Sequence, residues 1–323
     1  MSDAERWAFP ESMQPSEDSV GFDLSRAVDA VVRVRAEIPD DAFTAPVLGT
    51  ERIGSGVLIR DGLVLTIGYL ITEAETVWLT TNDGKVVPGF PFAYDQATGF
   101  GLVRALGQLP AAPMPLGSAA RCAKGDPLIV IGHGGRAHAL CTTLTVRREF
   151  AGYWEYLLDE ALFTAPAHPE WGGAALLDAS GALIGLGSLL VQEAVDGQAR
   201  QCNMFIPIDL LGPILDDLLA TGQSSRPPRP WLGVYAREDG GDVVVAGVAE
   251  GGPAARAGLR EGDRLRGVAA DRVESLAGFY RSVWGCGDAG ASIPIVVSRG
   301  GDVLRFRVDS VDRSALLRRP RLH

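Results

Sequence analysis

Short runs of β-branched and aliphatic residues, separated by glycine and aspartate, fill the first two thirds of this chain of 323 residues. Such runs occur at residues 30–34, 56–59, 77–80, 128–132 and 182–186. Glycine occurs 40 times and proline 20 times, so turns are frequent and each strand must be short. Many short strands between frequent turns favour a β-barrel or a β-sandwich over a helical bundle.

A change of pattern after residue 222 indicates a second domain. A helix is expected at residues 207–219, because leucine and isoleucine recur there at helical spacing and Pro207 falls in the first turn. The proline-rich residues 223–230 then predict a linker. Beyond the linker, we expect mixed strand and helix: elements at residues 243–245 and 253–257, a helix at residues 275–284, and strands at residues 293–298 and 304–308.

The two ends of the chain carry no domain pattern of their own. Residues 1–21 are polar and aperiodic and are expected to form a flexible extension. Residues 311–323 form a basic tail. The pattern between the ends predicts a β-rich domain at residues 22–222 and a mixed α+β domain at residues 231–310.

The net charge of −10 argues against a nucleic-acid partner, because such partners need a basic footprint. The beginning of the chain lacks a basic segment followed by an apolar run, and no apolar stretch approaches the roughly 20 residues that span a bilayer. We therefore expect no membrane contact and a cytoplasmic location. The tail is too short to change the charge argument, although it contains four arginines: Arg313, Arg318, Arg319 and Arg321.

The cysteines and histidines show no metal-binding spacing, so we expect no metal and no cofactor. Reduced, buried thiols are expected at Cys122, Cys141, Cys202 and Cys286. His133 and His138 flank two glycines and are expected to be exposed loop residues. A nucleophile–base pair of Cys141 with His133 or His138 remains conceivable, although the sequence shows no acid to orient it.

The motif at residues 54–59, followed by residues 61–62 and 65–66, resembles the opening of trypsin-like serine proteases of the HtrA/Deg (DegP-like) family. Residues 116–118 and 125–132 resemble the start of that family's second barrel. Residues 175–185 and 205–207 resemble the strands after its nucleophile and the lead into its last helix. The resemblance implies a mainly β fold, a chymotrypsin-like pair of six-stranded β-barrels.

The three positions that carry the family's catalytic triad hold other residues. Tyr69 stands in place of histidine, Gly99 in place of aspartate and Gly172 in place of serine, or Trp171 after a slip of one residue. A phenol has a usual pKa of about 10, against about 6.5 for histidine, and is a poor base at neutral pH. The chain is therefore expected to be a pseudoprotease and no enzyme. Glu170 and Trp171 are expected to leave the cleft collapsed or plugged.

The second domain resembles a bacterial PDZ domain. Residues 231–234 match its carboxylate-binding loop, and residues 252–259 and 262–265 match its most characteristic run. The resemblance implies that a peptide adds as a strand along residues 234–237, and that backbone N–H groups of the loop receive its terminal carboxylate. The residues expected to bind the peptide are Trp231, Leu232, Gly233 and Val234, with Tyr280 or Trp284 lining the groove.

These expectations combine into a peptide-binding scaffold or assembly subunit whose partners are protein carboxyl termini. The family resemblance also implies a homotrimer or hetero-oligomer, to which Trp7, Phe9 and Phe22 would contribute packing. Three alternatives remain open. The chain could be an active serine endopeptidase or chaperone with an unrecognised catalytic set, or a regulatory subunit of an active paralogue. Its PDZ domain could hold subunits together instead of capturing peptides.

Overall fold

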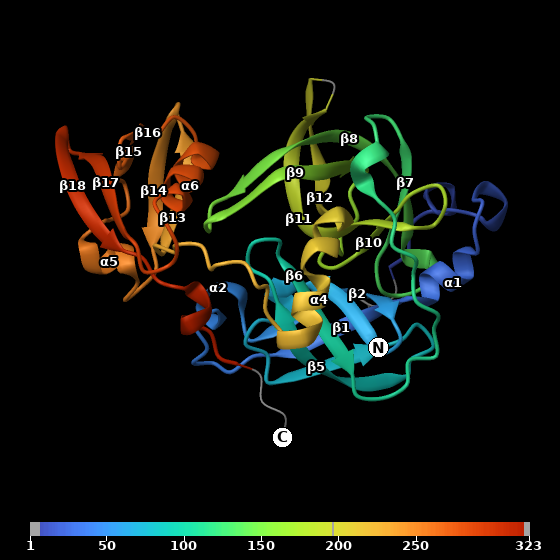
Figure 1. Ribbon diagram of the computed structural model, residues 1–323. Coiled ribbons are helices and arrows are strands. Elements are labelled where there is room, and N and C mark those ends of the chain that lie inside the picture. The colour runs from blue at the N-terminus through green and yellow to red at the C-terminus, as the bar shows by residue number, and fades with distance from the viewer. Residues whose placement is uncertain (1–6, 196, 320–323) are drawn as a thin grey trace. The chain divides into compact units, whose positions relative to one another are not determined.

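The computed structural model describes residues 7–195 and 197–319 and divides into two compact units. The barrel unit comprises the described residues up to Arg148, Glu160–Ser224 and the residues from Arg318 onward. The PDZ unit comprises Glu149–Asp159 and Ser225–Leu317. The boundary between Ser224 and Ser225 falls inside residues 223–230, the stretch expected as a linker. The first segment of the PDZ unit is the tip of a hairpin whose strands continue into the barrel unit (Figure 1).

The first barrel is closed by six antiparallel strands in the order β1-β2-β3-β6-β5-β4. A short helix, α1 (Leu24–Asp29), precedes them and is capped by the Asp23 carboxylate, which accepts from the Arg26 N–H at 2.9 Å. The strands are β1 (Val31–Glu37), β2 (Glu51–Arg60), β3 (Leu63–Ile67), β4 (Thr76–Thr80), β5 (Val86–Tyr94) and β6 (Phe100–Ala105). Two further short helices are α2 (Ala45–Leu48) and α3 (Gly68–Ile71).

The second barrel is closed in the order β10-β11-β12-β9-β8-β7. Its core contains Leu140, Leu162 and Phe205, all fully buried. Its strands are β7 (Pro127–Ile131), β8 (Ala139–Gly152), β9 (Tyr156–Ala165), β10 (Ala175–Leu177), β11 (Leu183–Val195) and β12 (Gln198–Pro207). The expected double six-stranded β-barrel is thus confirmed.

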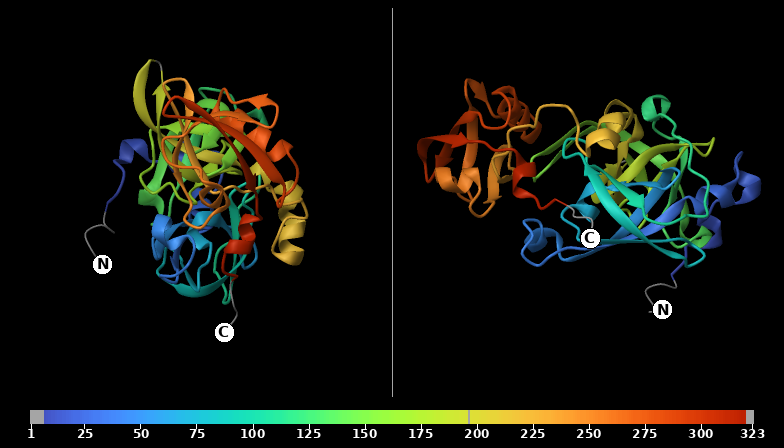
Figure 2. Two further views of the ribbon diagram at one scale, coloured as in Figure 1. Left: turned by 90° about the vertical axis from the view of Figure 1, so that its left-hand side faces the viewer. Right: turned by 60° about the horizontal axis from the view of Figure 1, so that its bottom comes forward.

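The helix expected at residues 207–219 begins later in the structure. Pro207 is the last residue of β12, where it pairs with Gly185 of β11, so strand pairing overrides the helical signal at that end. A 3₁₀ turn, Ile208–Leu210, then leads into α4 (Gly212–Thr221), which has Pro213 in its first turn. Ile214 and Leu218 are buried, and α4 lies beside β5 (Figure 1, Figure 2).

The PDZ unit is built on a sheet with the strand order β13-β14-β15-β17-β18, with β16 paired to β15. Helix α5 (Pro253–Ala257) coincides with the element expected at residues 253–257, and α6 (Leu276–Gly285) begins one residue later than the expected helix. Ser275 caps α6, because its Oγ accepts from the Gly278 N–H at 3.0 Å. The strands are β13 (Val234–Asp239), β14 (Asp242–Val248), β15 (Arg264–Val268), β16 (Asp271–Arg272), β17 (Ser292–Arg299) and β18 (Asp302–Asp309).

Residues 7–21, expected as a flexible extension, lie against the second barrel. The Phe9 N–H donates to the Ala137 carbonyl at 3.0 Å, and the Phe9 ring packs against that barrel's core. A Cβ on Gly181 would lie 2.5 Å from the Phe22 ring. All three aromatics expected to pack between subunits therefore make contacts within the chain, since Trp7 packs on the His138 ring. None of the helices in the described part of the chain is long and apolar enough to cross a lipid bilayer.

Candidate functional site

The loop at residues 231–234 directs three consecutive backbone N–H groups toward one point. Gly233 makes this possible, because it has a φ of +76°, a conformation that favours glycine. A Cβ on Gly233 would lie 2.9 Å from the Trp231 ring and 3.1 Å from the Ala249 Cβ. Converging N–H groups of this kind form a concave site for an anion.

A carboxylate of the same chain occupies this site. Glu155, at the tip of the β8–β9 hairpin, accepts through Oε1 from the N–H groups of Gly233 at 2.6 Å and Val234 at 2.9 Å. Its Oε2 accepts from the Leu232 N–H at 3.0 Å. The side chain is buried, with 6% of the residue exposed.

The rest of the hairpin tip is held by β13 and α6. The Ala236 N–H of β13 donates to the Tyr153 carbonyl at 3.0 Å. The Tyr280 hydroxyl of α6 donates to the Gly152 carbonyl at 2.7 Å and accepts from the Glu155 N–H at 3.2 Å. The hairpin tip therefore follows the path expected for a bound peptide, beside β13 and next to α6.

The first and last residues of the hairpin tip, Glu149 and Asp159, are held by one arginine. Arg281 of α6 forms ion pairs with Glu149 and, at 2.6 Å, with Asp159. Leu157 is buried in the apolar core of the PDZ unit. Glu155 itself has a φ of +59°, which costs a non-glycine residue on the order of 1 kcal/mol or more and persists only where surrounding contacts impose it.

The structure brings together most of the expected peptide-binding residues. Leu232, Gly233 and Val234 supply the N–H groups, whereas the Trp231 N–H donates to the Val311 carbonyl and does not join them. Tyr280 is the groove residue that contacts the hairpin. Trp284 stacks on Tyr280, with ring centroids 5.7 Å apart.

The sequence analysis missed Glu155. Its local signal was weak: one acid between two aromatic residues, Trp154 and Tyr156, just after the turn residue Gly152. No motif of the PDZ resemblance includes these residues, because they lie in the segment assigned to the barrel domain.

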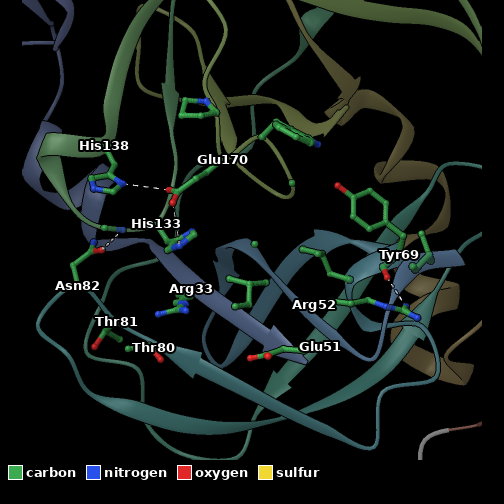
Figure 3. A pocket seen from close by; sticks show the side chains of 18 residues that line it. Arg33, Glu51, Arg52, Tyr69, Thr80, Thr81, Asn82, His133, His138 and Glu170 are labelled. Carbon is green, nitrogen blue, oxygen red and sulfur yellow. Dashed lines mark hydrogen bonds and ion pairs between the residues drawn. The ribbon is translucent and has the colours of Figure 1, made fainter. Parts of the chain in front are cut away.

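The barrel unit contains a cavity of about 920 Å³. Figure 3 shows charged and imidazole side chains on its wall, with Tyr69 on the opposite side from His138. The lining residues that carry polar side chains are Arg33, Glu51, Arg52, Tyr69, Thr80, Thr81, Asn82, His133, His138, Glu170 and Trp171. The expectation of a collapsed or plugged cleft is therefore wrong, since Trp171 lines an open cavity.

Two of the three positions matched to the catalytic triad meet at this cavity. A Cβ on Gly172 would lie 2.9 Å from the Tyr69 hydroxyl oxygen. That hydroxyl donates to the Ser188 carbonyl at 3.0 Å, and burial raises the pKa of Tyr69. Gly99 lies in a turn with a φ of +85° and its carbonyl accepts from the Gly68 N–H at 2.7 Å.

Hydrogen bonds hold the loop before Gly172 open. The Glu170 carboxylate accepts from the indole N–H of Trp7 at 3.2 Å and lies 3.2 Å from His138 Nδ1. The Glu170 N–H donates to His168 Nδ1 at 3.0 Å, and His168 Nε2 lies 2.9 Å from the His138 carbonyl. Burial lowers the pKa of His168 to about 4, so this ring is neutral and acts as a bridge within the loop.

The Glu170 carboxylate stays ionised in this setting. Burial alone would raise the pKa of Glu170, but the hydrogen bonds from His138 and Trp7 and the nearby His133 outweigh burial and lower it. His133 Nε2 lies 3.9 Å from the Glu170 Oε1, and His133 Nδ1 lies 3.1 Å from the Ser55 hydroxyl.

Two expectations about histidines and cysteines need correction. His138 is buried, because its ring packs on Trp7 with centroids 4.1 Å apart, and His133 is mostly covered. Of the four thiols, none is in a disulfide, but only Cys202 is buried and Cys141 is exposed. Cys141 faces outward because it alternates with buried neighbours along β8, so its pairing with either histidine gains no support. Within the described residues, no three acidic, histidine or cysteine side chains form a metal-binding cluster.

Comparison with known proteins identifies both halves of the chain. A family model described as a trypsin-like peptidase domain matches residues 54–186, and a PDZ domain model matches residues 230–309. The chain is 26% identical to serine endoprotease DegS of Salmonella typhimurium, over 90% of this chain and 85% of DegS. It is 27% identical to Protease Do-like 1, chloroplastic, of Arabidopsis thaliana, over 81% of this chain and 64% of that protein.

Among solved structures, the HtrA-type protease AlgW with decapeptide matches with a TM-score of 0.53. The match covers 92% of this chain and 98% of that chain at 24% sequence identity. This structural match supports the fold described above, a pair of β-barrels followed by a PDZ domain.

The prediction that the chain is no enzyme is overturned by these relatives. DegS is named a serine endoprotease and Protease Do-like 1 a protease, so the comparisons point to an enzyme. The residues at positions 69, 99 and 172 do not by themselves show a loss of catalysis.

The buried Glu155 carboxylate generates a pH-dependent prediction. Burial raises the pKa of Glu155 to about 7, against the opposing N–H groups of Val234, Leu232 and Gly233 and the charge of Arg313. The bound carboxyl therefore holds its proton more tightly than a solvated one, whose pKa is about 4.3. Hairpin binding is then strongest at low pH and weakens as the pH rises through about 7.

We expect the ¹³C signal of the Glu155 carboxyl carbon to titrate with a midpoint near pH 7 in the full chain. Glu155→Gln identifies the signal by removing it. A midpoint near 4.3, the value for a solvated glutamate, would show that the carboxylate is not enclosed by the loop in solution.

Proposed function

Because this chain belongs to the HtrA/Deg family of trypsin-like peptidases that carry a PDZ domain, we propose that its PDZ groove binds the carboxyl-terminal residues of protein partners. The observation that carries the proposal is the convergence of the N–H groups of Leu232, Gly233 and Val234 on one carboxylate. A peptide's terminal carboxylate has the same charge and the same acceptor geometry as a glutamate side chain.

The neighbouring strand edge supports binding of an extended peptide. The Ala236 N–H of β13 donates to a carbonyl outside the sheet, that of Tyr153, as a strand donates to an added peptide. Tyr280 of α6 supplies a hydroxyl to the backbone on the other side. Backbone hydrogen bonds then provide affinity for any sequence, and the carboxylate site selects chain ends.

The first test of this proposal changes Gly233. Gly233→Val should weaken binding of fluorescein-labelled peptides with apolar last residues by at least about 10-fold, or about 1.4 kcal/mol. The physical reason is that a β-branched side chain disfavours the φ of +76° and would meet the Trp231 ring. Amidating the peptide's carboxyl terminus should weaken binding similarly. Fluorescence anisotropy measures both effects.

A matched control is Gly247→Val in β14, where a Cβ would make only an ordinary contact of 3.6 Å with the Tyr235 ring. That variant should bind like the unchanged chain, and circular dichroism should show that all variants fold. If amidation has no effect on binding, the groove does not capture chain ends.

A second candidate function is hydrolysis of peptide bonds in the barrel cleft, which the names of the relatives favour. The specific observation is an acid–base group on the cavity wall. Burial lowers the pKa of His133, so its ring is neutral at pH 7 and can accept a proton. The hydroxyl nearest to its Nδ1 is that of Ser55, at 3.1 Å, with Glu170 on the Nε2 side. Ser55 is fully buried, so this set requires local opening before it reaches a substrate.

Cleavage of fluorescently labelled casein tests this candidate. We expect any cleavage to fall about 100-fold or more in Ser55→Ala and in His133→Ala, the usual size of a lost proton-transfer group. Ser180→Ala, on an exposed turn, is the matched control and should keep the activity of the unchanged chain. Cleavage that survives in Ser55→Ala would exclude this nucleophile, and absence of cleavage by the unchanged chain would exclude the second candidate.

A further inference from the structure

We propose that the tip of the β8–β9 hairpin, residues 149–159, is a built-in competing ligand of the PDZ groove that a partner's carboxyl terminus must displace. This inference rests on the proposed function, because it concerns the same groove. It adds that the groove is occupied by the chain itself in the absence of a partner, and that Glu155 is the residue that occupies it.

The carboxylate site has room for only one anion. Both oxygens of Glu155 are engaged by the three N–H groups of the loop, at 2.6 to 3.2 Å. A second carboxylate would need the same three N–H groups and the same space, both of which the Glu155 carboxyl group already takes up. Glu155 and a peptide's terminal carboxylate therefore exclude one another.

The strand edge is blocked in the same way. A peptide that adds beside β13 needs the N–H of Ala236, which already donates to the Tyr153 carbonyl at 3.0 Å. The Tyr280 hydroxyl is also engaged, by the Gly152 carbonyl and the Glu155 N–H. The hairpin tip thus uses both recognition elements of the groove, the anion site and the strand edge, and a peptide can use neither until the tip leaves.

Parts of the hairpin tip remain open to solvent, although hydrogen bonds, ion pairs and the buried Leu157 hold the rest of it. Tyr153 is 50% exposed, and Asp159 is largely exposed at the other end. Glu155 carries the positive φ of +59°, which relaxes once its carboxylate is released. The tip is covalently joined to β8 and β9, so its effective concentration at the groove is on the order of millimolar and even a weak ligand competes.

Competition of this kind lowers the apparent affinity for a peptide by the fraction of molecules in which the groove is open. We expect Glu155→Ala to bind the fluorescein-labelled peptides about 10-fold more tightly than the unchanged full-length chain. Glu155→Gln keeps the shape but replaces one acceptor oxygen with an NH2 donor that faces the N–H groups of the loop, and it should give a smaller gain. The matched control is Glu261→Ala, which removes one exposed acid of the PDZ unit outside the hairpin tip and should leave the affinity unchanged.

Hydrogen exchange of residues 150–158, followed by mass spectrometry, provides a second readout that needs no peptide. These amides should exchange faster in Glu155→Ala than in the unchanged chain, and they should exchange faster in the unchanged chain when peptide is added. Equal exchange in both proteins would overturn the inference, because Glu155 would then not hold the hairpin.

The affinities separate the failure of this inference from the failure of the proposed function. If the unchanged chain and Glu155→Ala bind peptide equally well and amidation abolishes binding, the inference is wrong and the proposed function stands. If neither protein binds peptide, the proposed function is wrong and no competition exists.

Discussion

The arrangement of the PDZ groove depends on three buried N–H groups, those of Leu232, Gly233 and Val234, which require an acceptor. A buried donor without a partner costs about 1–3 kcal/mol, and Gly233 directs the N–H groups of three successive residues to one point. No backbone carbonyl can satisfy all three, whereas one carboxylate can. The chain supplies that carboxylate from Glu155, and the path of the hairpin follows: Tyr153 beside β13, Leu157 in the core and Arg281 between two acids.

In the barrel cleft too, a carboxylate accepts hydrogen bonds from several sides, but there it holds a loop and does not fill an anion site. Glu170 is a carboxylate with donors on two sides, His138 and Trp7, and it holds the loop before Gly172 in place. His168 joins that loop to the carbonyl of His138 as a neutral ring. In both units, then, one partly or fully buried acid holds a loop of a candidate site in place. The difference is that Glu155 occupies the anion site of the groove, whereas Glu170 stands on the wall of an open cavity.

The sequence predicted the features that depend on local pattern. Alternating short strands and the start of α6 near Ser275 follow from turn residues and periodicity, and both are present. The start of α4 was misplaced because Pro207 belongs to a strand ladder with Gly185, a pairing that no local pattern reveals. The burial of His138 depends in the same way on Trp7, which is more than a hundred residues away in the chain.

Glu155 could not be predicted for the same reason. It contacts Leu232, 77 residues later, and the sequence contains no feature that pairs one acid with one distant loop. The most direct measurement of this contact is the ¹H–¹⁵N spectrum of the full-length chain. The amide protons of Leu232, Gly233 and Val234 should resonate downfield, as protons donated to a carboxylate do, and all three should move upfield in Glu155→Ala. Unchanged amide shifts for these three residues would show that the Glu155 carboxylate does not occupy the loop, and would contradict the account.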